Sequence, residues 1–442
     1  MPTDTTATPA VTGRSPVHGD KTRLSRRHAA EWRFRMYGIL ALSFGILCVV
    51  ALFSAITYNG WTAFQQTSVK LDVTFDKSVI DPTGKATIDE LYRAEWTDLA
   101  RKALLKAVGL SAPPTNRRER LRLYEVLSRG VDVQLRDMYL ADRSLAGKTV
   151  PVWLLVNSNI DQLMKDNISR STPNELRLVK DDQIAVIDKL AKDGRLEKQL
   201  SLGLITRTDS SLPEMAGMWV GIVGTFYMML TVVLLAVPIG VAAAAYLEEF
   251  APRNWFTDLI EVNINNLAAV PSIVFGLLGL AVFINFFGMP RSASLVGGLV
   301  LTLMTLPTVI IATRAAIRAV PPSIREAALG VGASKMQTFF HHTLPLAVPG
   351  ILTGTIIGLV QAAGETAPLL MLGLIAYVGD APQTPLDPAT AMPGLIYYWA
   401  GPKADLRGFI ERAAGGTLVL LAFLMIMNSV AVILRNRFER KW

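Results

Sequence analysis

The sequence is poor in the residue types that build disulfide frameworks and metal centres. Cys48 is the only cysteine among 442 residues, so no internal disulfide can form and a disulfide-rich scaffold is excluded. There are four histidines, and the adjacent His341 and His342 have no cysteine or third histidine nearby. Adjacent histidines without such partners are typical of a solvated helix end, so we expect no metal site.

The sequence also lacks a complete nucleotide-binding motif and a signal-peptide cleavage site. The segment from Gly330 to Lys335 is rich in glycine, but it has neither the four-residue gap nor the Gly-Lys-Ser/Thr ending of a P-loop. We therefore expect no ATP hydrolysis by this chain itself. No small-residue cleavage site follows the first apolar segment, which favours an uncleaved membrane anchor over a removed signal peptide.

Apolar residues are abundant: 51% of the chain is hydrophobic, and the mean hydropathy is +0.36. Runs of about 20 apolar residues are the signature of membrane-spanning helices. Six runs predict six spans, at residues 37–58, 216–247, 262–287, 293–316, 346–374 and 413–434. Four prolines in or beside these runs are expected to bend the helices: Pro238, Pro271, Pro307 and Pro349.

Positive charge in the short loops predicts the orientation of the spans. With the N-terminus inside, sixteen Lys and Arg residues flank the inner side, against four in the short outer loops. This bias places both termini in the cytoplasm. The net charge of +8 then follows from the topology and from contact with anionic lipid, and nucleic acid binding is not required.

The chain divides into four predicted parts. Residues 1–36 are a basic cytoplasmic N-terminus that we expect to be disordered, and 37–58 are the first membrane anchor. Residues 59–212 are long enough for a separate core and, by the orientation above, form an extracytoplasmic domain. Residues 213–442 hold the other five spans.

Periodicity in the extracytoplasmic domain predicts an α+β structure. Apolar residues alternate from Val69 to Phe75, and a second strand is expected from Val150 to Val156. Helical periodicity extends over residues 91–108, 117–127 and 183–190.

Residues 317–345 connect the fourth and fifth spans and are polar at both ends. Ser323 precedes Glu326 by three residues, the spacing of a capping box, which predicts that a helix begins here. Gly330 and Gly332 would interrupt the helix and allow a helix–turn–helix. On spacing alone, an ordinary intracellular loop with a well-capped helix is an equal alternative.

The same segment closely resembles the EAA loop of ABC importer permeases. That pattern is Glu-Ala-Ala, three residues, Gly, nine residues, and Ile-x-Leu-Pro, with His342 here in the usual Ile position. The matching positions are Glu326, Ala327, Ala328, Gly332, Leu344 and Pro345. The resemblance implies that a helix at residues 321–340 docks into a groove on a cytoplasmic ATPase.

The fifth predicted span carries two further patterns. Gly350, Gly354, Gly358 and Ala362 recur every four residues, a stripe that permits close helix packing within the chain or between subunits. Glu365 lies inside the same span, and an intramembrane carboxylate is costly enough to be functional by default.

The string Gly-Glu-Thr-Ala-Pro-Leu-Leu at residues 364–370 narrows the resemblance to the A-type (PstA-type) membrane subunit of phosphate-specific ABC importers. In that family an arginine often precedes the Gly-Glu pair by three residues, but here the position holds Gln361, which supplies no Coulombic attraction for an anion. The resemblance implies that a few polar groups line the pathway or contact another subunit. These are Gln361, Gly364, Glu365, Thr366 and Arg314. For Arg314 we favour the simpler explanation, a positive-inside anchor, and for Glu365 we favour an arginine of the partner subunit as its contact.

The resemblance implies an all-α polytopic membrane protein, like a type I ABC importer permease, with an inserted α+β extracytoplasmic domain. It implies a non-catalytic subunit without a cofactor, in a cytoplasmic membrane, which moves inorganic phosphate inward. Expected partners are a homologous second permease, a dimer of ATPase subunits that uses ATP, an extracytoplasmic phosphate-binding protein and membrane lipid.

Three alternatives remain. The first is a permease for another oxyanion. The second is a membrane sensor that uses residues 59–212, although no signalling domain follows the last span. The third is an ion-coupled transporter, which would need inverted repeats and more intramembrane ionisable groups.

Overall fold

The structure is a computed structural model that describes residues 21–80, 87–375 and 377–438. It separates into two compact units, one up to Ala55 and one from Ile56 onward. The first unit is formed by most of α1 (Lys21–Trp61). The expected disorder of residues 1–20 lies outside the described residues, whereas for residues 21–36 the expectation is wrong. Alanine, arginine and glutamate in this stretch favour a helix, so α1 begins well before its apolar, membrane-spanning part.

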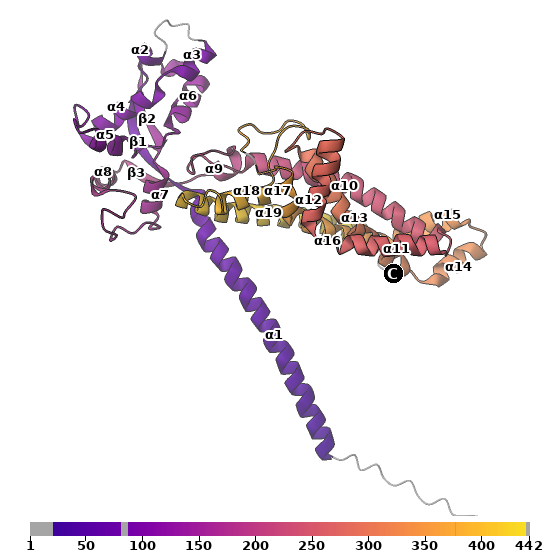
Figure 1. Ribbon diagram of the computed structural model, residues 1–442. Coiled ribbons are helices and arrows are strands. Elements are labelled where there is room, and N and C mark those ends of the chain that lie inside the picture. Colours follow the sequence, from indigo (N-terminus) through magenta and orange to yellow (C-terminus); the bar gives the residue numbers. More distant parts are fainter. Residues whose placement is uncertain (1–20, 81–86, 376, 439–442) are drawn as a thin grey trace, which may run out of the picture. The chain divides into compact units, whose positions relative to one another are not determined.

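The α+β domain is built on a three-stranded antiparallel sheet with strand order β2-β1-β3 (Figure 1). The predicted alternation is present: Val69, Leu71 and Val73 of β1, and Phe75 directly after it, are completely buried. Leu71 pairs with Val152 of β2, and Ser68 pairs with Glu197 of β3. The strands are β1 (Gln65–Thr74), β2 (Thr149–Leu155) and β3 (Leu196–Leu200).

Short helices surround this sheet and complete its core. The predicted helix at 91–108 is interrupted at Ala94 and Glu95, and α6 and α7 were not predicted. The helices are α2 (Lys77–Ile80), α3 (Ile88–Arg93), α4 (Trp96–Val108), α5 (Arg117–Tyr124), α6 (Val131–Ala141), α7 (Ser158–Met164), α8 (Asp181–Lys192) and α9 (Gly203–Thr206). Single 3-10 turns lie at Thr62–Phe64 and Arg143–Leu145.

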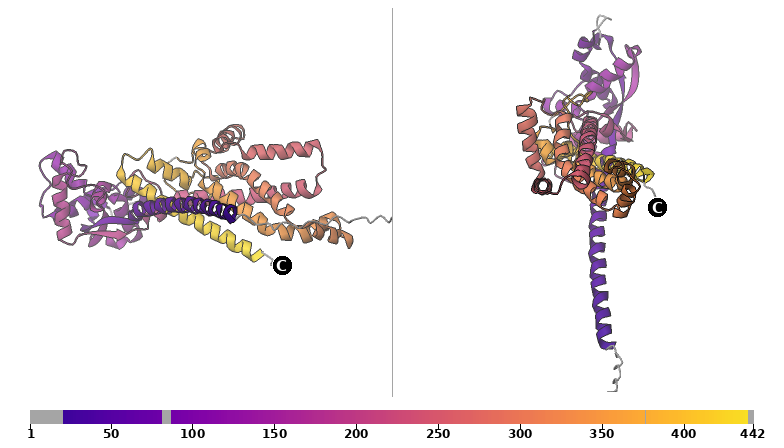
Figure 2. Two further views of the ribbon diagram at one scale, coloured as in Figure 1. Left: turned by 90° about the horizontal axis from the view of Figure 1, so that it is seen from below. Right: turned by 90° about the vertical axis from the view of Figure 1, so that its right-hand side faces the viewer.

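Long apolar helices form the rest of the second unit. In it α13 packs against both α10 and α16, and α19, yellow in Figures 1 and 2, packs against α16 and α18. The helices are α10 (Trp219–Ala245), α11 (Trp255–Ala268), α12 (Ser272–Gly279), α13 (Ser294–Arg318), α14 (Pro322–Gly330), α15 (Lys335–Thr338), α16 (Leu344–Gly364), α17 (Ala367–Met371), α18 (Met392–Ala400) and α19 (Arg407–Phe438). Three π-helical segments continue them at Tyr246–Phe250, Leu280–Phe286 and Phe339–Thr343.

Among the described residues, five helices are long and apolar enough to cross a membrane, and a bent pair would make a sixth. The bent pair lies where one span, bent at Pro271, was predicted at 262–287: Trp255–Ala268 and Ser272–Phe286 meet at 101°. Pro271 explains the break, since it lacks an amide proton and forces Val270 out of the helical region.

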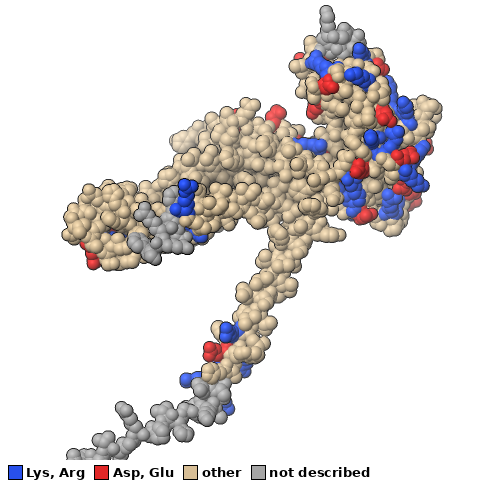
Figure 3. Space-filling model, turned by 180° about the vertical axis from the view of Figure 1, so that it is seen from behind, with Lys and Arg blue, Asp and Glu red and all other residues tan. Residues whose placement is uncertain are grey.

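The distribution of charge separates the two kinds of structure. Figure 3 shows Lys, Arg, Asp and Glu gathered on the α+β domain, whereas the visible surface of the long helices is nearly free of them. Along α1 the visible charges lie only near the N-terminal end. A surface without charge along long helices is suited to lipid or to another apolar helix.

Candidate functional site

The predicted helix–turn–helix between the fourth and fifth spans is formed by α14 and α15. Helix α14 ends at Gly330, and Gly332 has a φ of +92°, a left-handed conformation that favours glycine. The predicted cap at Ser323 is wrong, because Pro321 is the N-cap residue and Pro322 opens the helix. A capping box is instead formed at α15 by Ser334 and Gln337.

The six residues of the EAA pattern occupy different environments. Glu326 and Ala327 are exposed on α14, whereas Ala328 is buried. Gly332 is exposed in the turn. Leu344 and Pro345 are half-buried in the first turn of α16. Thus α14 offers one face to solvent and buries the other against the chain.

Apolar side chains extend the exposed face of α14 into the turn and α15. Leu329 and Val331 are 46% and 87% exposed, and Met336 and Phe340 are 57% and 52% exposed. Clustered exposed apolar residues at a loop are typical of a protein interface. We call these four residues the apolar rim; they follow the exposed Glu326 and Ala327 along the chain.

Arg325 anchors α14 to two other helices. Its guanidinium donates to the carbonyl oxygens of Ile317 and Val320 at the end of α13, at 2.7 and 3.1 Å. It also donates to Glu249, in the π-helical segment after α10, at 2.9 Å. Ile324 of α14 packs on an apolar cluster that includes Ile317 of α13 and Ile351 of α16. Helix α14 is therefore attached to α13, to α16 and to the segment that continues α10.

The chain enters α16 without a flexible loop, which the predicted boundary at residue 345 did not anticipate. From Lys335 the backbone is helical through Phe339–Thr343 and on to Gly364. Pro345 lacks the amide proton that a regular helix would use at this position, and the π-helical turn directly before it accommodates the missing bond. The coupling segment is thus continuous with a membrane helix.

Arg314 does not face the pathway as a free charge. It is 8% exposed and pairs with Glu261 at 2.6 Å and with Glu248 at 3.4 Å. Arg318 also pairs with Glu248, at 2.7 Å. These ion pairs tie the end of α10 and helix α11 to α13 beside a cavity of about 530 Å³. The carboxylates neutralise Arg314, so its assignment as an anion-attracting residue has no support in this geometry.

The second polar region lies at the end of α16, where the predicted continuous span to residue 374 is broken. Gly364 is the last helical residue, Glu365 is extended with ψ of 132°, and α17 restarts at Ala367. Gln361 and Gly364 are exposed, and Glu365 and Thr366 are half-buried. Among the residues that the structure describes, no cation pairs with Glu365. The break therefore presents an amide, a hydroxyl and a carboxylate close together.

The glycine stripe of α16 is explained by packing within the chain. A Cβ on Gly350 or Gly354 would lie 2.6 or 2.1 Å from the Cβ atoms of Ala316 and Ala312 on α13. A Cβ on Gly358 would lie 2.8 Å from Thr305, also on α13. The stripe was expected to pack either within the chain or between subunits, and the structure contains the contact within the chain.

Three features of the site could not be found from sequence patterns. Arg325 and Glu249 are separated by 76 positions, and nothing local indicates their pairing. The same holds for Arg314 with Glu248 and Glu261. The sequence shows the residues of the apolar rim as isolated apolar residues in a polar loop, but only the structure shows that they are exposed.

Comparison by sequence relates this chain to ABC transporter permeases. Residues 236–442 match the family described as binding-protein-dependent transport system inner membrane component, and residues 21–174 match a domain of unknown function, DUF3333. The probable ABC transporter permease protein YqgI of Bacillus subtilis is 31% identical over 53% of this chain and 82% of its own length. The phosphate transport system permease protein PstA 1 of Mycobacterium tuberculosis is 32% identical over 51% of this chain and 73% of its own length.

A solved structure, described as inward-facing conformations of the MetNI methionine ABC transporter, matches with a TM-score of 0.39 and 17% identity. The match covers 51% of this chain and 95% of that one. The relatives by sequence are non-catalytic membrane subunits. The chain therefore belongs to the binding-protein-dependent inner-membrane permeases of ABC importers, as a PstA-type member that carries an additional N-terminal domain.

Proposed function

We propose that this chain moves inorganic phosphate into the cytoplasm as one of two permease subunits of an ABC importer. Relatives such as PstA 1 are named for phosphate transport, which supports phosphate as the cargo. A dimer of ATPase subunits supplies the energy, and an extracytoplasmic phosphate-binding protein delivers the anion. Both chain termini lie in the cytoplasm, on the same side as α14.

The observation that carries the coupling mechanism is the attachment of α14. Its exposed face, Glu326 and Ala327 with the apolar rim, is the docking surface for the ATPase. Its buried face is fixed to α10 and α13 through Arg325 and packs on α16. When the ATPase subunits close on ATP, α14 moves as a rigid body and pulls these three helices with it. Alternating access of the pathway follows from that movement.

A reconstituted transporter tests this mechanism. The permease pair, the ATPase and the binding protein are placed in proteoliposomes, and phosphate uptake and ATP hydrolysis are measured together. Glu326→Lys and Ala327→Trp should each reduce uptake by about tenfold, because both disturb the centre of the docking surface. Asp405→Asn, an exposed carboxylate outside this surface, is the matched control. Normal uptake with both α14 variants would refute the coupling role.

The identity of the anion needs a separate arm of the same assay. Gln361 offers hydrogen bonds but no charge, so the sequence leaves another oxyanion open. Competition of labelled phosphate uptake by sulfate and by molybdate distinguishes them. Phosphate uptake that neither competitor reduces supports phosphate, and ATP-dependent sulfate or molybdate uptake without phosphate uptake would transfer the function to that anion.

The break at Gln361–Thr366 forms part of the pathway or the contact with the second permease subunit. Glu365 has no cation partner in its own chain among the described residues, which favours a cation from the second subunit. Glu365→Gln should then reduce the amount of second subunit that co-purifies. Unchanged co-purification together with reduced uptake would place Glu365 in the pathway instead.

A further inference from the structure

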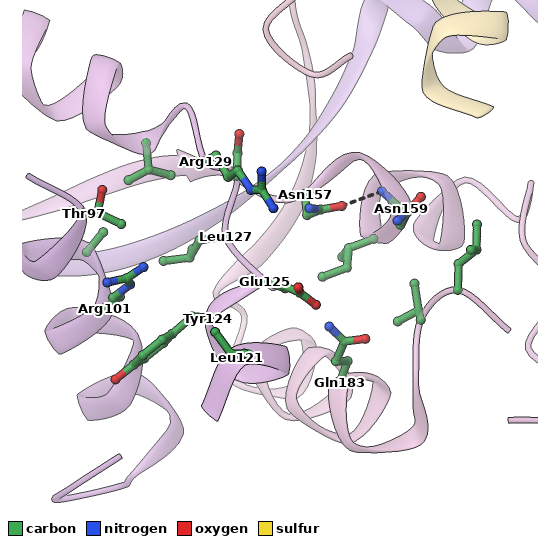
Figure 4. Close-up of a pocket in the computed structure, with 16 residues that line it drawn as sticks. Thr97, Arg101, Leu121, Tyr124, Glu125, Leu127, Arg129, Asn157, Asn159 and Gln183 are labelled. Carbon is green, nitrogen blue, oxygen red and sulfur yellow. Dashed lines mark hydrogen bonds between the residues drawn. The ribbon is translucent and has the colours of Figure 1, made fainter. Parts of the chain in front are cut away.

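The α+β domain contains a cleft of about 390 Å³ that the transport mechanism does not use (Figure 4). It lies between α4, the chain from α5 to α6, the start of α7 and the segment that leads into α8. The volume is in the range of small-molecule binding sites. Its apolar floor includes Leu127, Ile160 and Val179, each no more than 5% exposed.

The polar walls of this cleft carry more positive than negative charge. The ionisable groups among the lining residues are Arg101, Arg129 and Glu125. Figure 4 shows Arg129 beside Asn157 at one end, and Arg101 beside Tyr124 at the other. The two guanidinium groups therefore approach the cleft from separate elements, α4 and the turn before α6.

Both arginines have hydrogen-bond donors to spare. Arg101 lies over the ring of Tyr124, 4.8 Å from its centroid, and makes one ion pair with Asp98 at 3.3 Å. That pair is more than 40% exposed on both sides, so it is weak. The Nε atom of Arg101 is buried without a hydrogen-bond partner in the described part of the chain. Arg129 is exposed and has no ion pair with any described residue.

This chemistry selects a class of ligand. Guanidinium groups bind carboxylates and phosphates with two parallel hydrogen bonds, and the amides of Asn157 and Asn159 can serve hydroxyl or carbonyl groups. The apolar floor requires a carbon skeleton, which an inorganic anion lacks. We propose that the cleft binds a small organic anion, a phosphate ester or a carboxylate held by Arg101 and Arg129, and that α7 reports its occupancy to α19.

The route from the cleft to α19 runs along a single short helix. Asn157, Asn159 and Ile160 line the cleft at the start of α7. At the other end of α7, Lys165 binds Glu411 in the first turns of α19, at 2.9 Å, and Gln162 donates to the same carboxylate. The side chains of Lys165 and Glu411 are 3% and 7% exposed, so this link is shielded from water. A shift of α7 cannot leave α19 unaffected without breaking a buried ion pair.

A second connection starts from Ser128 in the cleft wall. Its hydroxyl donates to the Glu214 carboxylate at 2.6 Å. Arg412 of α19 is 4% exposed and donates to the backbone carbonyls of Pro213 and Glu214, at 3.0 and 3.4 Å. The cleft thus contacts two of the elements that hold the beginning of α19, namely α7 and the segment at Pro213 and Glu214, and this contact distinguishes it from an isolated surface depression.

The binding step is tested with the purified full-length chain in detergent micelles. Calorimetric titrations use sn-glycerol 3-phosphate and succinate as the organic probes, and inorganic phosphate as the third arm. At least one organic probe should bind saturably, and Arg101→Gln and Arg129→Gln should each weaken that binding by about tenfold. Arg143→Gln, an exposed arginine of the same domain outside the cleft, should change it by less than about twofold.

Each other outcome overturns a stated part of the proposal. No saturable binding of either organic probe up to about 10 mM refutes the site. Inorganic phosphate binding as tightly as both organic probes refutes the organic-anion assignment. Binding that neither arginine variant weakens refutes the assigned residues. The relative affinity of the two organic probes distinguishes a phosphate ester from a carboxylate.

The reporting step is tested by hydrogen exchange at residues 407–416 with the tighter organic probe. Saturation should slow exchange there by about threefold in the wild-type chain. Glu411→Gln retains the shape but removes the carboxylate that ties Lys165 to α19, while Lys165 keeps its ion pair with Asp161 at 2.7 Å. The probe should therefore still bind while the effect on α19 disappears. Binding without any change at residues 407–416 in the wild-type chain would refute reporting through α7. This test does not depend on phosphate being the cargo of the transporter.

Discussion

Replacing Arg325 by alanine tests the attachment of α14 directly. The variant removes the hydrogen bonds to the carbonyls of Ile317 and Val320 and the ion pair with Glu249. The side chains of Arg325 and Glu249 are 21% and 19% exposed, so solvent screens part of the loss. Charge-assisted bonds to two carbonyls, together with a partly screened ion pair, contribute about 2–4 kcal/mol to holding α14 in place.

Hydrogen exchange measures this local stability. A loss of about 2–4 kcal/mol in the opening free energy of α14 corresponds to exchange at residues 322–330 that is about 30 to 700 times faster. The matched control is Arg318→Ala, because Arg318 has one ion pair, with Glu248, and is 60% exposed. We expect the control to change exchange in α14 by less than about fivefold.

Two results would contradict the reasoning. Exchange in Arg325→Ala within threefold of wild type would show that packing of Ile324, rather than Arg325, holds α14. Equal acceleration by Arg318→Ala would show that loss of any nearby positive charge loosens this end of the molecule. In the reconstituted transporter, Arg325→Ala should still hydrolyse ATP while phosphate uptake falls.

The remaining predictions concern single positions with built-in controls. Gly332→Ala should destabilise the turn by about 1–2 kcal/mol, because residue 332 has a φ of +92° that alanine adopts poorly. Faster hydrogen exchange in the turn would show this loss, whereas Gly330→Ala should leave the exchange rate unchanged. Gly354→Ala places a Cβ 2.1 Å from a side chain of α13 and should lower thermal stability by about 1–3 kcal/mol, whereas Gly364→Ala meets open space and should not. Burial raises the pKa of Glu214 above its ordinary value of 4.5, so the folded chain binds this proton more tightly than the unfolded chain. The contribution of Glu214 to stability is full below pH 4.5 and falls as the pH rises through the pKa of the folded state. In Glu214→Gln the melting temperature should therefore fall less over this pH range than in the wild-type chain. An unchanged dependence of melting temperature on pH would contradict the assignment.

The sequence was most informative where a local pattern decides the structure. The alternation in β1 and the glycines around α14 act within a few residues, and both are present as expected. Strand β3, Leu196–Leu200, was missed because it has apolar residues only at its ends and lies at the edge of the sheet. An edge strand is specified by its neighbour as much as by its own alternation.

Long-range geometry accounts for the other differences. A bend at Pro271 in the third predicted span was expected, but its size of 101° was not. Arg314 looked like a free positive charge because its partners, Glu248 and Glu261, lie more than 50 residues earlier in the chain. Sequence patterns identify charged residues near a predicted span, whereas only the tertiary structure shows which of them form ion pairs with each other.

The buried link between Lys165 and Glu411 limits how freely this permease could gain or lose its extra domain. Excision of the domain would remove Lys165 and Gln162, so Glu411 would keep a carboxylate in a place designed for a partner. Arg412 would keep its carbonyl acceptors at Pro213 and Glu214 in the connecting segment, but it would lose the carbonyl of Ala63, to which it donates at 3.2 Å. Excision would therefore break a buried ion pair and remove hydrogen-bond partners of two neighbouring residues of α19, which makes the domain an integral component of the fold around the start of this helix.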